Sequence, residues 1–190
     1  LADQIVGEVA RLEEMQPARG FTQVELGKRE EFVYDVRASF AGAAQGGFDG
    51  VRIRTGTAPR FARLEMGEPL REVEPLAVVE GDGEFEVRLP QKVTRGANAP
   101  IRVVFAAEIF LHATTFSAEV FSAEEGGLPQ PIEPGDASVA VSTNSLRVLG
   151  IEGATPDFIQ QLRLSSGIIT PNGDGVNDRL AIDYELFLLP

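Results

Sequence analysis

Apolar and polar residues alternate with a period of two along much of the chain. The apolar positions are Phe32, Tyr34, Val36, Ala38 and Phe40; Val51 and Ile53; Phe85, Val87 and Leu89; Ile101, Val103, Phe105 and Ala107; Phe116, Ala118 and Val120; and Val139 and Val141, followed by Leu146 and Val148. Successive side chains of a strand point to opposite faces, so each run predicts a half-buried β-strand. Val33, Asp35 and Arg37 then belong to the opposite face of the first run.

Glycine and proline separate these runs. Gly81-Asp82-Gly83 lies between Val79 and Phe85 and predicts a tight hairpin, because glycine adopts positive φ without a steric cost. Prolines stand where the runs begin or end, at positions where a missing N–H costs least. Strand signals recur roughly every 10–15 residues, which is typical of sandwiches. We therefore predict an all-β fold, an immunoglobulin-like antiparallel β-sandwich with a C-terminal extension strand.

The expected organisation is one sandwich domain followed by a short extension. The N-terminal segment permits a helix or a strand, and Gly7 favours the strand because glycine weakens a helix by about 1 kcal/mol. Residues 1–150 form the predicted sandwich, within which 124–136 is expected to be a solvated connection. Residues 151–190 contain a linker strand, a polar loop and a final strand.

Composition excludes several classes of function. The formal net charge of −12 provides no basic surface for releasing counterions from a nucleic acid, and it disfavours an anionic membrane. No stretch approaches the roughly 20 apolar residues that span a bilayer, so no membrane insertion is expected. The absence of cysteine excludes disulfides, thiol catalysis and cysteine-ligated zinc. His112 is the single histidine, which disfavours a transition-metal site.

The segment 170–178, TPNGDGVND, is the most distinctive part of the sequence. Side-chain oxygens are available from Thr170, Asn172, Asp174 and Asp178, and Val176 can offer its carbonyl. Calcium takes six to eight oxygen ligands, and the interspersed glycines permit the necessary curvature. The spacing departs from an EF-hand because the twelfth position is alanine. The alternatives are a calcium loop and an Asx-rich turn that satisfies its own backbone without metal.

This segment and the strand-like sequence after it resemble a known class of bacterial modules. The match covers Thr-Pro-Asn-Gly-Asp-Gly at 170–175, Asn177 and Asp178. It resembles the immunoglobulin-like modules near the C-termini of secreted and cell-surface proteins, of the gliding-motility-associated C-terminal type or the flagellar-hook-capping type. The resemblance covers only about 25 residues. It implies an extracellular or cell-surface location, a β-sandwich module and no catalysis.

The final strand presents a full apolar face. Its members are Leu180, Ile182, Tyr184, Leu186 and Leu188. Leaving five such residues in water forgoes several kcal/mol at about 25 cal/mol per Å². This strand can pack on its own chain, begin a further module, or insert into a neighbouring subunit by donor-strand exchange.

We therefore expect a non-catalytic structural or adhesive module with a calcium-stabilised junction. No G-x-S-x-G elbow or phosphate-binding glycine motif is present in the sequence. The expected partners are neighbouring domains or identical subunits. One alternative is a filament subunit that polymerises by strand exchange. Another is a carbohydrate-binding module for surface glycans, which is disfavoured because the chain has no tryptophan and only two tyrosines.

The calcium hypothesis makes a direct prediction. Chelation should lower the melting temperature, because a ligand that binds only the folded state adds about 2.7 kcal/mol at 100 times its dissociation constant. Calorimetry with Ca²⁺ and with chelator measures the difference, and Asp174→Asn with Asp178→Asn should remove it. An identical melting temperature in both buffers would contradict a calcium site.

Overall fold

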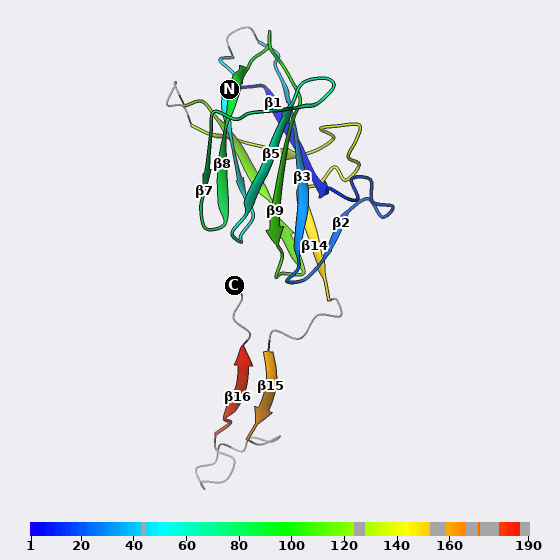
Figure 1. Cartoon of the computed structure of the whole chain (residues 1–190), viewed down its shortest axis with the longest axis vertical. Helices are drawn as coiled ribbons and strands as arrows, with labels where there is room; N and C mark the ends of the chain where they lie inside the picture. Colours follow the sequence, from blue (N-terminus) through cyan, green and yellow to red (C-terminus); the bar gives the residue numbers. More distant parts are fainter. Residues whose placement is uncertain (43–44, 124–127, 153–158, 166–170, 172–178, 187–190) are drawn as a thin grey trace. The chain divides into compact units, whose positions relative to one another are not determined.

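A computed structural model describes residues 1–42, 45–123, 128–152, 159–165, 171 and 179–186 (Figure 1). The chain divides into two compact units, Leu1–Gly153 and Ala154–Pro190, called unit 1 and unit 2 below. All regular elements in the described residues are β-strands. These residues contain no helix long and apolar enough to cross a membrane.

Unit 1 contains two large sheets and one small sheet. The long sheet has the order β13-β1-β3-β9-β5-β6, with β13 Glu133–Pro134, β1 Gln4–Arg11, β3 Arg29–Ser39, β9 Ile101–Glu108, β5 Arg60–Met66 and β6 Arg71–Val73. The second sheet has the order β12-β11-β4-β8-β7, with β12 Gln130–Pro131, β11 Ser117–Phe121, β4 Phe48–Arg54, β8 Glu84–Val93 and β7 Ala77–Glu80. The small sheet has the order β10-β14-β2, with β10 Ala113–Thr115, β14 Arg147–Ile151 and β2 Thr22–Glu25.

A large hydrophobic core joins the two large sheets. Phe32 and Phe105 come from the long sheet, Phe85 comes from the second sheet, and Phe116 directly precedes β11. The ring centroids of Phe32 and Phe116 are 5.1 Å apart, and those of Phe85 and Phe105 are 5.2 Å apart. Aromatic pairs at such distances add to the stabilisation from burial. The predicted all-β sandwich is confirmed.

Two local predictions are also confirmed. The N-terminal segment is the strand β1, which pairs antiparallel with β3 from Gln4 opposite Ser39 to Arg11 opposite Phe32. The hairpin between β7 and β8 turns at residues 81–83, where Gly83 has φ +90°. Pairing in unit 1 is antiparallel except for β1 with β13 and β14 with β2.

The segment after residue 128 differs from the expectation. A solvated connection was expected up to residue 136, but Ile132 is only 5% exposed and belongs to the core. The predicted strand at Val139 and Val141 is also wrong, because this stretch is irregular. Val139 is 94% exposed in a turn, whereas Val141 is buried. The alternation of apolar residues predicted a strand wrongly here, because backbone N–H groups of this stretch donate to a side chain and not to a neighbouring strand.

Unit 2 contains one strand pair. β15 (Ile159–Leu164) pairs antiparallel with β16 (Ile182–Leu186), and the register shifts between Gln160 and Arg163. Beyond the ladder, Ser165 donates its backbone N–H to the carbonyl of Ala181.

Candidate functional site

The predicted calcium ligands fall outside the described part of the chain. These residues are Thr170, Asn172, Asp174, Val176 and Asp178. The calcium loop therefore stays a prediction. Among the described residues, no group of three or more histidine, aspartate or glutamate side chains is placed to hold a metal ion.

The predicted assembly strand is described only in part. Its middle forms β16, whose backbone pairs with β15 of the same chain. Ile182 is 51% exposed, and Leu180 is half-buried. Tyr184 and Leu186 belong to the strand, but their side chains, and Leu188 altogether, lie outside the description. Donation of this strand to a neighbouring subunit stays a prediction.

Unit 1 carries a row of charged residues on the face of the long sheet that points away from the core. In the register of the strands, Glu8 of β1 lies opposite Asp35 of β3, and Asp35 lies opposite Arg102 of β9. Arg102 in turn lies opposite Glu65 of β5. Their neighbours along the strands are core residues, so alternation places this row on the opposite face. Glu8 and Asp35 are nevertheless at most 1% exposed, and Arg102 is 8% exposed.

Asp35 and Arg102 form a bidentate ion pair. The Arg102 Nε and Nη2 atoms each donate to one carboxylate oxygen of Asp35, at 2.7 Å. These hydrogen bonds raise the pKa of Arg102 above its ordinary value, and the nearby charges of Asp35, Glu65 and Glu8 act in the same direction. Removing one partner of a buried pair leaves an uncompensated charge, which typically costs about 3–5 kcal/mol.

Glu8 binds backbone instead of a cation. Its Oε1 atom accepts the N–H groups of Ala137 and Ser138, and its Oε2 atom accepts that of Asn144, all at 3.0 Å. The three donors lie in the irregular segment 132–146, called the strap below. A buried carboxylate must be hydrogen-bonded or paired, and these backbone groups meet that requirement. The strap is therefore fixed across the outer face of the long sheet.

The strap also buries a second, smaller hydrophobic cluster. Ala10, Val33 and Val104 project from three strands onto the outer face, and Val141 of the strap covers them. Leu12 and Met15 pack at the edge of this cluster. The half-buried expectation for β3 is wrong on this side, because Val33 and Asp35 are also buried. A usable signal was the apolar run 103–107, since strands buried on both faces lose their alternation.

The second sheet presents an ion-pair ladder on its outer face. Glu119 of β11 accepts hydrogen bonds from Arg52 and from Arg54 of β4, the latter at 2.9 Å. The same arginines reach across β4 to β8, where Arg52 binds Glu86 at 2.6 Å and Arg54 binds Glu84 at 3.0 Å. Opposite charges directly across neighbouring strands stabilise their pairing.

The aromatic ring of Phe121 packs at one end of this ladder. Phe121 lies over the backbone of Gly50, where an added Cβ would be 2.3 Å from the ring. The guanidinium carbons of Arg52 and Arg88 lie 5.5 and 6.0 Å from the ring centroid, which is the range of cation–π attraction. Asp49 then binds Arg88 at 3.2 Å and the N–H of Ala123 at 2.9 Å. Arg52, Arg54 and Arg88 thus each have an acidic partner on this face.

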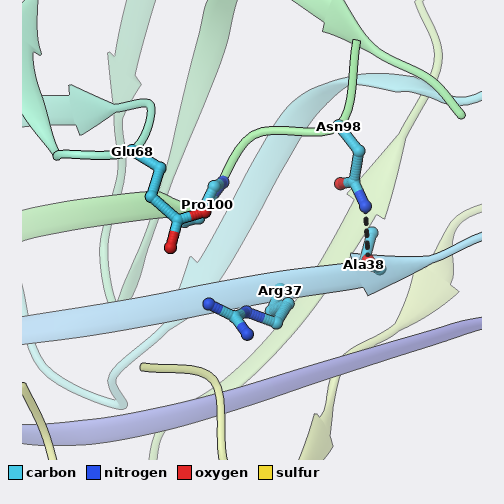
Figure 2. Close-up of a pocket in the computed structure, with 5 residues that line it drawn as sticks. All are labelled: Arg37, Ala38, Glu68, Asn98 and Pro100. Carbon is cyan, nitrogen blue, oxygen red and sulfur yellow. Dashed lines mark hydrogen bonds between the residues drawn. The ribbon is translucent and has the colours of Figure 1, made fainter. Parts of the chain in front are cut away.

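Figure 2 shows a small pocket beside the C-terminal end of β3. Its lining residues are Arg37, Ala38, Glu68, Asn98 and Pro100. Asn98 donates its side-chain N–H to the carbonyl of Ala38 at 3.0 Å. Arg37, Glu68 and Asn98 are exposed, and the described lining offers no serine, histidine or tyrosine. The lining therefore provides no nucleophile with an adjacent base.

Comparisons with known proteins give weak structural likenesses. No family model matches the chain, and no curated protein matches it. Solved structures with similarity include the C-terminal domain of the AgI/II polypeptide BspA of Streptococcus agalactiae, with 12% identity, TM-score 0.45, and coverage of 77% of this chain and 49% of that chain. They also include the N-terminal domain of an adhesin of Streptococcus gordonii, with 8% identity, TM-score 0.47, and coverage of 78% and 33%.

A third structure is the pilus backbone protein RrgB of Streptococcus pneumoniae, with 10% identity, TM-score 0.39, and coverage of 62% of this chain and 31% of that chain. The chain spans half or less of each of these structures. Likeness at this level is too weak to support an argument about function. The fold assignment rests on the strand pairing and the core described above.

Glu119 makes the ladder sensitive to acid. Hydrogen bonds from Arg54 and then Arg52 hold the pKa of Glu119 below its ordinary value of 4.5. A lowered folded-state pKa gives stability that is present above the unfolded pKa and is lost as pH falls through the folded one. We expect Glu119→Gln to cost on the order of 1 kcal/mol at pH 7, and the difference from wild type to shrink below about pH 4.5.

Urea denaturation of both proteins between pH 7 and pH 3 measures this difference. Glu74→Gln, at an exposed position, is the matched control and should track the wild type. A constant difference between Glu119→Gln and wild type over the whole range would contradict the assignment.

Proposed function

We propose that this chain is a non-catalytic structural module of an extracellular or cell-surface bacterial protein. In this role unit 1 holds two points of a polypeptide apart at a fixed distance. The extracellular setting is supported by the resemblance of 170–178 to modules of secreted proteins.

The route of the chain through unit 1 is the observation that carries this proposal. Leu1 lies at the end of the sandwich where β3 finishes. The backbone N–H of Asp3 donates to the carbonyl of Ser39, the last residue of β3, and the N–H of Gly47 donates to the carbonyl of Leu1. Ile151 lies at the end where β3 begins, because its carbonyl binds the N–H of Leu26. Figure 1 shows the N-terminus and the end of β14 at opposite ends of unit 1.

The separation is set by the longest strand. β3 has 11 residues, and a strand rises about 3.4 Å per residue, which gives a spacing of roughly 35 Å. The polar groups of both outer faces are largely used internally, by the strap on one sheet and the ion-pair ladder on the other. Buried charges that bind one another or the backbone maintain a shape, whereas a catalytic group must face a substrate.

Domain replacement tests the structural role. In the parent protein, residues 1–153 are exchanged for an unrelated β-sandwich whose ends are also about 35 Å apart. We expect display on intact cells and the parent protein's attachment to be retained, because only the spacing matters. A replacement domain with both ends on one side is the control and should impair attachment.

Loss of attachment with normal display of the 35 Å replacement would contradict a spacing role. It would instead indicate a specific binding surface on unit 1, as the adhesive and glycan-binding alternatives require.

A further inference from the structure

We propose that β1 and the strap form a mechanical clamp that resists force applied between the two ends of unit 1. This inference rests on the proposed structural role, because a spacer between two points of a chain transmits tension. The clamp is defined by residues 5–9 of β1 and residues 132–146 of the strap.

The two segments lie side by side, and the ladder at the start of the strap is parallel. β13 at the start of the strap pairs parallel with β1, with Val6 opposite Glu133. The N–H of Gly135 then binds the carbonyl of Gly7 at 3.0 Å. At the far end of the strap, the N–H of Val9 binds the carbonyl of Ser145 at 2.8 Å. The strap thus contacts β1 at its beginning and again near its end.

Side chains add further bonds along the same line. Glu8 accepts three backbone N–H groups of the strap, as described above. Thr143 donates its hydroxyl to the carbonyl of Val9 at 2.9 Å, and Thr22 donates to the same carbonyl at 3.1 Å. Glu8 thus contributes three of the hydrogen bonds between β1 and the strap.

The order of the chain determines how tension reaches these bonds. Tension enters β1 at its N-terminal end, close to Leu1, and leaves through β14, which follows the strap directly and ends at Ile151. The two segments advance in the same direction, from Gly135 beside Gly7 to Ser145 beside Val9, and they are pulled from opposite ends. Their hydrogen bonds are therefore sheared together instead of being opened one at a time. Failure then requires several bonds to break in one event, which slows forced unfolding.

The strap also ties the clamp to the second sheet. The N–H of Ile132 binds the carbonyl of Ala118 in β11 at 2.8 Å. Its side chain packs against the position of Gly7, where an added Cβ would be 2.7 Å from Ile132 Cγ2. The close approach of β1 and the strap therefore depends on glycine at position 7. Shear on β1 is shared between both layers of the sandwich.

Constant-force pulling of the full chain in two directions tests the clamp. The chain lacks cysteine, so Ile151→Cys or Gly96→Cys gives a unique attachment point opposite an N-terminal handle. Ile151 is at the far end of the sandwich. Gly96 follows β8 at the same end as Leu1, and a Cβ there meets nothing within 4 Å. We expect a longer lifetime under force for the 1–151 pair, where the bonds are sheared, than for the 1–96 pair, where they are peeled.

Glu8→Gln tests the central contact. The substitution keeps the size of the side chain but replaces one acceptor oxygen by an amide donor. We expect at least about a tenfold shorter lifetime in the 1–151 direction, the effect of losing hydrogen bonds to a charged group, and a smaller change in the 1–96 direction. Val87→Ala, in the core on β8, is the control for general destabilisation and should shorten both lifetimes to a similar degree.

Equal wild-type lifetimes in the two directions would overturn the clamp, and so would a Glu8→Gln effect as uniform as that of Val87→Ala. Neither result would affect the spacing role, which the domain replacement tests separately. Failure of that replacement would leave the direction dependence measured here intact.

Discussion

The carboxylate of Glu8 is the contact on which the arrangement of unit 1 depends. It is fully buried, and its partners are the backbone N–H groups of Ala137, Ser138 and Asn144. Without them a buried negative charge would be prohibitively costly, and without the charge three amides of an irregular segment would lack acceptors. The carboxylate and the three amides therefore satisfy one another's hydrogen-bonding needs. As a result, the strap is held against the outer face of the long sheet.

Charge has different roles on the two outer faces. On the long sheet, Asp35 and Arg102 are removed from water, so their pairing is obligatory and defines how β3 and β9 are placed under the strap. On the second sheet the ladder around Glu119 remains partly solvated, so each pair contributes little and depends on pH and salt. The charges of the first face are buried, whereas those of the second keep the outer side of that sheet polar.

Much of the sandwich could be predicted from sequence, because alternation reports a strand wherever one face is buried. The strap could not be predicted. Its proline-rich beginning matches a solvated connection, and its hydrogen-bond acceptor lies about 130 residues earlier, at Glu8. Nothing local in the sequence indicates such a partner. A charged residue within an otherwise apolar strand, such as Glu8 or Asp35, is the only local indication that the outer face of that strand is covered by another segment. The predicted calcium loop lies outside the described residues.

Hydrogen exchange of individual strap amides tests the role of Glu8 most directly. The N–H groups of Ala137, Ser138 and Asn144 lie in an irregular segment that ordinarily would exchange quickly. If Glu8 holds them, their protection should match that of the ladder between β1 and β3 and far exceed that of Val139 in the exposed turn. Exchange of all three at the rate of Val139 would contradict the account.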